Sequence, residues 1–136
     1  MKIAELRQNV MRVVENATSV TKRTGEKAVF MDRVPDGIPS GVFVNVGSIE
    51  REQRTVENTS DLNTATVDIV CFSFVDRLTA DTIADEIIEN LDNLSDDYFQ
   101  YIINKNLYIS NYNDDYGDFN VVLSFEFVTW EIKNHG

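Results

Sequence analysis

The segment from residue 29 to residue 47 constrains the fold of this chain most, because it gathers most of the residues that interrupt regular structure. Its sequence, VFMDRVPDGIPSGVFVNVG, holds both prolines of the chain and three of its six glycines. Proline cannot donate a hydrogen bond to a β-ladder, and glycine accepts the positive φ angles that other residues resist. Residues 34–39 are therefore predicted to form a rigid turn, here called the elbow, between a strand at 29–32 and another at 42–46.

Three later segments also have the pattern of β-strands. Residues 64–75 form a long run that is apolar near its end, residues 107–112 form a short one, and residues 119–130 alternate between apolar and polar. The apolar face of the last segment consists of Phe119, Val121, Leu123, Phe125 and Phe127. Residues 96–106 are compatible with either a short helix or a strand. The acidic sequence between residues 111 and 118 predicts a turn that joins two of these strands.

Two segments have the spacing of amphipathic helices. In residues 3–14 the apolar side chains recur at helical intervals, and a polar stretch ends this helix near Asn16. The second helix is predicted to begin after Thr79 as N-cap, with Asp81 in its first turn and with Leu78 and Ile83 placed as a hydrophobic staple. Its apolar stripe is predicted to consist of Ala80, Ile83, Ala84, Ile87, Leu91 and Leu94.

The order of these elements predicts the fold class and the domain organisation. The chain has 136 residues, which is the usual size of one domain and is long enough to bury a core without disulfides or metal. It contains no internal repeat or low-complexity linker. We therefore expect a single α+β domain over residues 1–136, with a mostly antiparallel β-sheet packed against two main helices.

Composition excludes several classes of function. No run approaches the roughly 18 apolar residues of a membrane span, and the amino terminus has no hydrophobic signal core, so we expect synthesis in a cytoplasm and no membrane partner. The net charge of −11 argues against sequence-specific binding of nucleic acid. Cys71 is the only cysteine, in a strand-like run, and is predicted to be a buried apolar residue.

The sequence carries no recognisable catalytic or metal-binding constellation. His135 is the only histidine and lies near the end of the chain, so a Cys–His pair with Cys71 is not credible. The acidic turn fails the calcium-loop pattern: counting from Asn111, the glycine position falls on Tyr116 and the glutamate position on Val122. We expect no enzymatic activity, no cofactor and no metal site, although a weak divalent site between subunits stays open as an alternative for this turn.

Charge is distributed unevenly along the chain. Residues 1–54 carry nine Lys and Arg against seven Asp and Glu, whereas residues 55–136 carry three against sixteen. Such an imbalance allows one surface to be much more positive than another, which suits head-to-tail contact between identical copies.

Three polar regions are candidates for partner contact. Residues 53–63 are predicted to form an exposed excursion and residues 111–118 an exposed hairpin turn, and mere solvated loops are the alternative in both cases. Their candidate contact residues are Gln53, Arg54, Glu57, Asp61, Asn113, Asp114, Asp115 and Tyr116. The third region is the outer face of the second helix, which is either a solvated acidic face or a wall that faces a partner or a lumen. Its residues are Asp81, Asp85, Glu89 and Asp92.

Taken in order, these elements resemble a family of tailed-phage proteins, the tail-completion or tail-terminator proteins of long non-contractile tails, over roughly residues 1–132. The resemblance rests on residues 29–39, which include the elbow, on a long strand that ends near Ser73, and on the Ile-Ala-Asp helix at 83–87. One position departs from the pattern, because Ser40 and Gly41 stand where the family often has a proline and an aromatic residue.

The resemblance implies a structural virion protein without catalysis. Such a subunit forms a ring, commonly a homohexamer, which caps the head-proximal end of the tail tube and stops its growth. The implied partners are further copies of the chain, the tail tube protein and a head-connector or stopper protein, with DNA passing through the ring. The alternatives are a neck or head-completion connector, or an unrelated small acidic binding module or enzyme.

Overall fold

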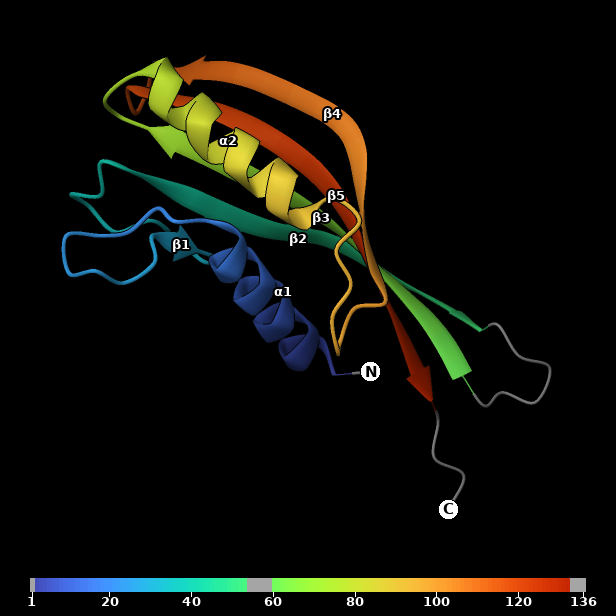
Figure 1. Ribbon diagram of the computed structural model, residues 1–136. Coiled ribbons are helices and arrows are strands. Elements are labelled where there is room, and N and C mark those ends of the chain that lie inside the picture. Colours follow the sequence, from blue (N-terminus) through green and yellow to red (C-terminus); the bar gives the residue numbers. More distant parts are fainter. Residues whose placement is uncertain (1, 54–59, 133–136) are drawn as a thin grey trace.

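The computed structural model describes residues 2–53 and 60–132, which form one β-sheet with two helices (Figure 1). The elements in chain order are α1 (Ile3–Ala17), β1 (Val29–Phe30), β2 (Ser40–Gln53), β3 (Ser60–Ser73), α2 (Arg77–Leu91), β4 (Tyr101–Asn113) and β5 (Asp118–Ile132). This architecture confirms the predicted α+β class.

The sheet is mostly antiparallel, with the strand order β1-β2-β3-β5-β4. Only the short pairing of β1 with β2 is parallel, and it joins Val29 to Val42 and Phe30 to Phe43. The pairs β2–β3, β3–β5 and β4–β5 are all antiparallel. The long middle strands β3 and β5 thus form the centre of the sheet, and β4 is one of its edges.

Both helices lie on the same face of the sheet, and the hydrophobic core lies beneath them (Figure 1). Because strand side chains alternate between faces, the alternation predicted for β5 directs one apolar row into this core. Leu123, Phe125 and Phe127 of that row are fully buried, Val121 is buried, and Phe119 is partly buried at the margin. Cys71 is also fully buried, as predicted, and burial raises the pKa of its thiol far above the ordinary value.

The first helix agrees closely with its prediction. Leu6, Val10, Val13 and Val14 are buried against the sheet, and the helix continues one residue past Asn16, to Ala17. Ile3 is the exception, because its side chain is 54% exposed at the start of the helix. Neither described helix is long and apolar enough to cross a membrane.

The predicted start of α2 was wrong. The helix begins at Arg77, and its N-cap is Asp76, whose Oδ1 accepts the N–H of Thr79 at 2.8 Å. Asp81 consequently lies beyond the first turn. The hydrophobic staple is wrong as well, since the side chain of Leu78 is 73% exposed. The apolar stripe is confirmed within the helix, while Leu94 lies past its end and is partly buried.

The predicted excursion at residues 53–63 was wrong at both of its ends. β2 continues to Gln53, β3 starts at Ser60, and Gln53 pairs with Asp61. Asn63, expected to be exposed, is 1% exposed. These polar residues form strands because the start of β3 also pairs with the end of β5, so ladders on both sides fix the backbone despite the polar sequence.

The segment that the sequence left ambiguous, residues 96–106, contributes to a strand. β4 starts at Tyr101 and runs 13 residues, with an irregular register between Asn104 and Tyr108. Asn106 takes a left-handed φ of 55° in this stretch, and its N–H is held by Oδ1 of Asn104 at 2.8 Å. The turn predicted between the last two strands is confirmed: Asn113 pairs with Asp118, and Gly117 has a φ of 72°.

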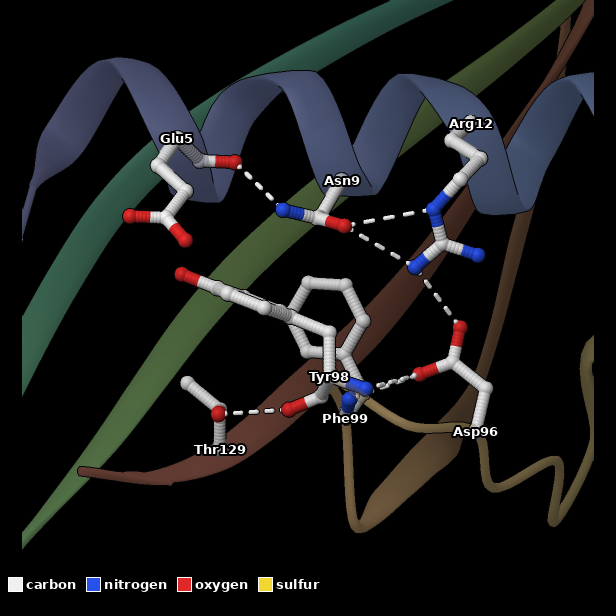
Figure 2. Close-up of polar contacts among 7 residues, drawn as sticks. All are labelled: Glu5, Asn9, Arg12, Asp96, Tyr98, Phe99 and Thr129. Carbon is white, nitrogen blue, oxygen red and sulfur yellow. Dashed lines mark hydrogen bonds and ion pairs between the residues drawn. The ribbon is translucent and has the colours of Figure 1, made fainter. Parts of the chain in front are cut away.

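A chain of polar contacts joins α1 to the loop before β4 (Figure 2). On the helix, Asn9 donates from Nδ2 to the carbonyl oxygen of Glu5 at 2.9 Å and accepts from Arg12 through Oδ1. Arg12 also donates from Nη2 to Oδ2 of Asp96 at 2.9 Å. The first helix is thereby fastened to a segment 84 residues away in the sequence.

Asp96 is the centre of that contact. Its Oδ1 accepts the N–H groups of Tyr98 at 2.9 Å and of Phe99 at 2.7 Å (Figure 2). Burial alone would raise the pKa of Asp96, but the hydrogen bonds from Phe99, Arg12 and Tyr98 outweigh it and hold the pKa below its ordinary value. The carbonyl oxygen of Tyr98 accepts the hydroxyl of Thr129 at 2.6 Å, which ties the same loop to β5.

Candidate partner-binding site

A groove lies between the elbow and the β4–β5 hairpin, on the sheet face opposite the helices. Its volume is about 920 Å³. The elbow forms one wall, the hairpin residues Asn113, Tyr116 and Asp118 form the other, and the sheet forms the floor. The elbow and the hairpin turn were both predicted from the sequence. That they lie on opposite sides of one groove was not predicted.

The floor of the groove is apolar because of strand alternation. Phe43 pairs with Val70, one position away from Val42 and Cys71, whose side chains point into the main core. Phe43 and Val70 therefore point to the opposite face. Phe72 lies on that face too, is 4% exposed, and makes an edge-on contact with the ring of Phe74 at 5.9 Å between centroids.

The elbow is held over this floor by a second, smaller hydrophobic cluster. Ala28, Phe30 and Phe72 form its buried part, and Val34 and Ile38 of the elbow pack against it. Gly37 makes the turn with a φ of 86°, as the sequence predicted. The carbonyl oxygen of Pro39 accepts the N–H of Phe74 at 2.8 Å, which fixes the end of the elbow to the end of β3.

Gly41 explains how the segment just before β1 approaches β2 so closely. A Cβ at this position would lie 2.7 Å from the carbonyl oxygen of Ala28 and 3.1 Å from Cζ of Phe72. The same carbonyl oxygen accepts the N–H of Val42 at 2.8 Å. The Ser40–Gly41 sequence, which departs from the resembled family, thus has a local physical reason: only glycine leaves room for this backbone contact.

The hairpin wall is built by Asn113. Its Oδ1 accepts the N–H of Asp115 at 3.1 Å, and its carbonyl oxygen accepts the N–H of Gly117 at 2.7 Å. This arrangement exposes Asp114, Asp115 and Tyr116, and the side chain of Tyr116 is 75% exposed. The prediction of an exposed hairpin turn here is confirmed.

The other predicted contact residues are placed as follows. Arg54 and Glu57 lie outside the described residues. Gln53 and Asp61 are paired with each other at the ends of β2 and β3, so their backbones belong to the sheet and not to a loop.

Of the four acidic residues predicted for an outer face, three lie on α2 on the side away from the core, and the fourth, Asp92, is the C-cap just past its end. Asp85, Glu89 and Asp92 are exposed, and Asp81 is partly exposed. Glu86, also on α2, instead binds within the fold: its two carboxylate oxygens accept the N–H of Ser19 at 2.5 Å and its hydroxyl at 2.8 Å. Burial would raise the pKa of Glu86, but these bonds and the nearby Lys27 lower it overall.

The groove suits contact with another polypeptide. Its lining combines apolar side chains with a charged rim of Arg23, Asp36 and Asp118. An apolar depression with few charged groups at its margin accepts an apolar side chain of a partner and orients it by the rim. Within the part of the chain that the structure describes, no three His, Cys, Asp or Glu side chains come together as a metal site would require.

Comparison with models of known protein families finds no match, and comparison with curated protein sequences finds none either. Among solved structures, the fold is similar to a chain of the "Virion of native gene transfer agent (GTA) particle". The two share 12% sequence identity with a TM-score of 0.67, and the match covers 90% of this chain and 95% of the other. With so low a sequence identity, the likeness shows only that the two chains share a fold. The shared fold extends over nearly all of both chains.

Proposed function

We propose that this chain is a structural virion protein of a tailed-phage-like particle. In this proposal it forms a closed ring, a hexamer, at the head-proximal end of a long tail. The ring stops growth of the tail tube and joins the tail to the head, and the chain acts without catalysis or cofactor.

The observation that carries the proposal is the fold likeness to a chain of a virion particle, over 90% of one chain and 95% of the other. It agrees with the independent resemblance of the elbow, Ser73 and the α2 sequence to tail-terminator proteins. Ser73 ends β3, as that resemblance implies, and its Oγ accepts the N–H groups of Val75 and Asp76 at 3.1 and 3.3 Å at the entry to α2.

The surfaces of the chain support a role in assembly. The groove offers an apolar floor of Phe43, Val70 and Phe72 to a partner, and Tyr116 adds an exposed aromatic side chain at its wall. Aromatic side chains in partly apolar depressions are typical anchors of protein interfaces. We assign contact with the tail tube or the head connector to this groove and its hairpin.

Charge sets the conditions for assembly. Six copies of a chain with a net charge of −11 carry about −66, so the ring must form against strong self-repulsion. Salt or divalent cations screen this repulsion and should favour the ring. If Asp81, Asp85, Glu89 and Asp92 line the channel, they repel DNA and leave it free to slide.

Assembly of tail tubes in vitro tests the proposed function. Tail tube protein from the same particle is polymerised alone and with increasing amounts of this chain, and tube lengths and decorated ends are measured by electron microscopy. The proposal expects shorter tubes with this chain at one end only. Tubes of unchanged length without the chain at their ends would contradict it, and binding to the portal side of heads instead would favour the connector alternative.

A variant pair sharpens the assay at the groove. Tyr116→Asp places a charge at the exposed aromatic position on the wall, whereas Ile3→Asp changes an exposed apolar side chain, 54% exposed, at the start of α1 and far from the hairpin (Figure 1). Both changes leave the core intact. The proposal expects Tyr116→Asp to reduce binding to tube ends at least about tenfold, and Ile3→Asp to leave it within about twofold. Equal binding by both variants would remove the hairpin from the contact.

A further inference from the structure

Strand β4 is an edge strand with an unusual concentration of exposed apolar side chains. Among the described residues, twelve large apolar side chains are exposed, and six of them lie on this one strand. They are Tyr101, Ile103, Leu107, Tyr108, Ile109 and Tyr112. Lys105 is the only charged residue within its 13 positions. A long, largely apolar edge with a single charged residue is a surface that pairs readily with another strand.

The backbone of this edge is available beyond its first residues. Ile102 donates its N–H to the carbonyl oxygen of Leu94 at 3.0 Å, so its backbone N–H points away from β5. In an antiparallel ladder its partner Phe127 then directs its own N–H and C=O groups away from β4, and so do the other odd-numbered residues of β5. The even-numbered residues of β5 face β4 and pair with Ile109 and Asn111. The intervening residues direct their N–H and C=O groups outward: these are Tyr108, Ser110 and Tyr112. No described strand pairs with this side of β4.

The opposite side of the same sheet has a second open edge. β1 covers β2 only at Val42 and Phe43, and no described strand lies outside β2 from Val44 onward. This outer part of β2 reaches Gln53 and carries Glu50, Arg51 and Glu52. One chain therefore presents two sheet edges that no described strand covers, one at each side of its sheet, with charges of +1 on β4 and −1 on the outer part of β2.

We propose that the outer edge of β4 in one copy pairs with the outer edge of β2, residues 44–53, in the next copy, so that the sheets of neighbouring copies become continuous. Two different edges joined in this way make a head-to-tail contact, which repeats from copy to copy and closes into a ring when the rotation allows. The closure of these contacts into a ring rests on the proposed function. The pairing of β4 with β2 rests only on the two edges that no described strand covers.

Hydrogen exchange of the full chain tests the pairing directly. Amide exchange is compared between a dilute sample and a concentrated or salt-assembled sample, while light scattering reports the mass. We expect the amides of Tyr108, Ser110 and Tyr112, together with outward amides of β2 beyond Phe43, to slow at least about tenfold on assembly. Protection of β4 alone would indicate a β4–β4 dimer and overturn the inference, as would an assembly in which β4 stays unprotected.

Two variant pairs separate backbone pairing from other effects. Ser110→Pro removes one outward N–H and leaves the ladder to β5 intact, whereas Ser110→Ala keeps that N–H and loses only the hydroxyl that accepts from Arg77 at 2.5 Å. Leu107→Lys adds a charge to the edge, and Ile3→Lys adds one to an equally exposed apolar side chain at the start of α1. The inference expects Ser110→Pro and Leu107→Lys to weaken assembly at least about tenfold, with both controls close to wild type.

The outcomes distinguish this inference from the proposed function. If copies assemble through β4 and β2 but do not bind tube ends, the proposed function fails and the edge pairing stands. If the chain caps tubes while β4 remains unprotected and Leu107→Lys has no effect, the edge pairing fails and the function stands. A chain that stays monomeric at every concentration, with or without magnesium and tube ends, overturns the edge pairing.

Discussion

Replacing Gly41 by alanine is the most direct test of how the segment before β1 is packed against β2. The new Cβ would lie 2.7 Å from the carbonyl oxygen of Ala28, 3.3 Å from the Cβ of Ala28 and 3.1 Å from Cζ of Phe72. The Phe72 ring can shift, but the Ala28 oxygen belongs to the backbone and accepts the N–H of Val42. The segment before β1 must therefore move away from β2.

The expected cost follows from three contributions. Overpacking of this kind costs about 1–3 kcal/mol, and the weakened backbone hydrogen bond costs about 1 kcal/mol. The loss of conformational freedom in the unfolded chain offsets about 0.4–1 kcal/mol of this. The net destabilisation should be about 2 kcal/mol, which for a chain of this size lowers the melting temperature by about 7 °C.

Gly47→Ala is the matched control in the same strand. A Cβ there would meet only the carbonyl oxygen of Thr66, at 3.7 Å, and φ is not in the left-handed region. This variant should be neutral or stabilised by up to about 1 kcal/mol. Urea unfolding followed by circular dichroism measures both variants. If Gly41→Ala is as stable as Gly47→Ala, the close approach of Ala28 to β2 does not exist in solution and this reasoning is refuted.

Three further predictions follow from the polar contacts and from the buried thiol. Asp76→Ala should lower the melting temperature by a few degrees, because the N–H of Thr79 loses its cap; an unchanged transition would place the start of α2 elsewhere. Asp96 and Glu86 have lowered native pKa values, so the stability they add is complete above about pH 5 and is lost as pH falls through those values. The double variant Asp96→Asn, Glu86→Gln should flatten the acid dependence of the unfolding free energy, and an unaltered slope would contradict these contacts. Cys71 should react with a thiol reagent only after unfolding, because burial raises its pKa; rapid labelling of the native protein would show that the core opens there.

The apolar periodicity of the sequence predicted the parts of the fold that the main core determines. Leu123 and Phe125 on β5, and Ile83 and Ile87 on α2, are buried where alternation and helical spacing placed them. These positions are predictable because each element must bury one face whatever its partners are. The elbow was predictable for a similar reason, since Gly37 and the prolines restrict the backbone locally.

The polar parts of the sheet could not be predicted in the same way. Residues 60–63 have the composition of a loop, yet they belong to a strand because β5 extends far enough to pair with them. Their partners on β5 lie 66 to 72 residues away in the sequence, from Asn63 paired with Thr129 to Ser60 paired with Ile132. The start of α2 was misplaced because Asp76 and Thr79 are both good N-cap residues. Only the structure shows that the carboxylate of Asp76 accepts the N–H of Thr79.

The groove had a weaker signal still. Its lining comes from the elbow, two strands and the hairpin, and these are brought together by the strand order β2-β3-β5-β4 and not by any local pattern. The sequence predicted only a rigid turn at the elbow, where Val34 and Ile38 are partly buried against the cluster that contains Phe72. Their second role, as a wall facing Tyr116 across the groove, follows only from the folded chain.

The mass of the assembled protein tests the central claim of a closed ring most directly. Light scattering, measured from dilute to concentrated samples at low and high salt and with magnesium, should reveal a discrete species of six 15.5-kDa copies, about 93 kDa, which salt favours. Negative-stain images of that species should show a ring with a central hole. A protein that stays at 15.5 kDa under every condition, or that grows into open filaments without a preferred mass, would contradict the claim.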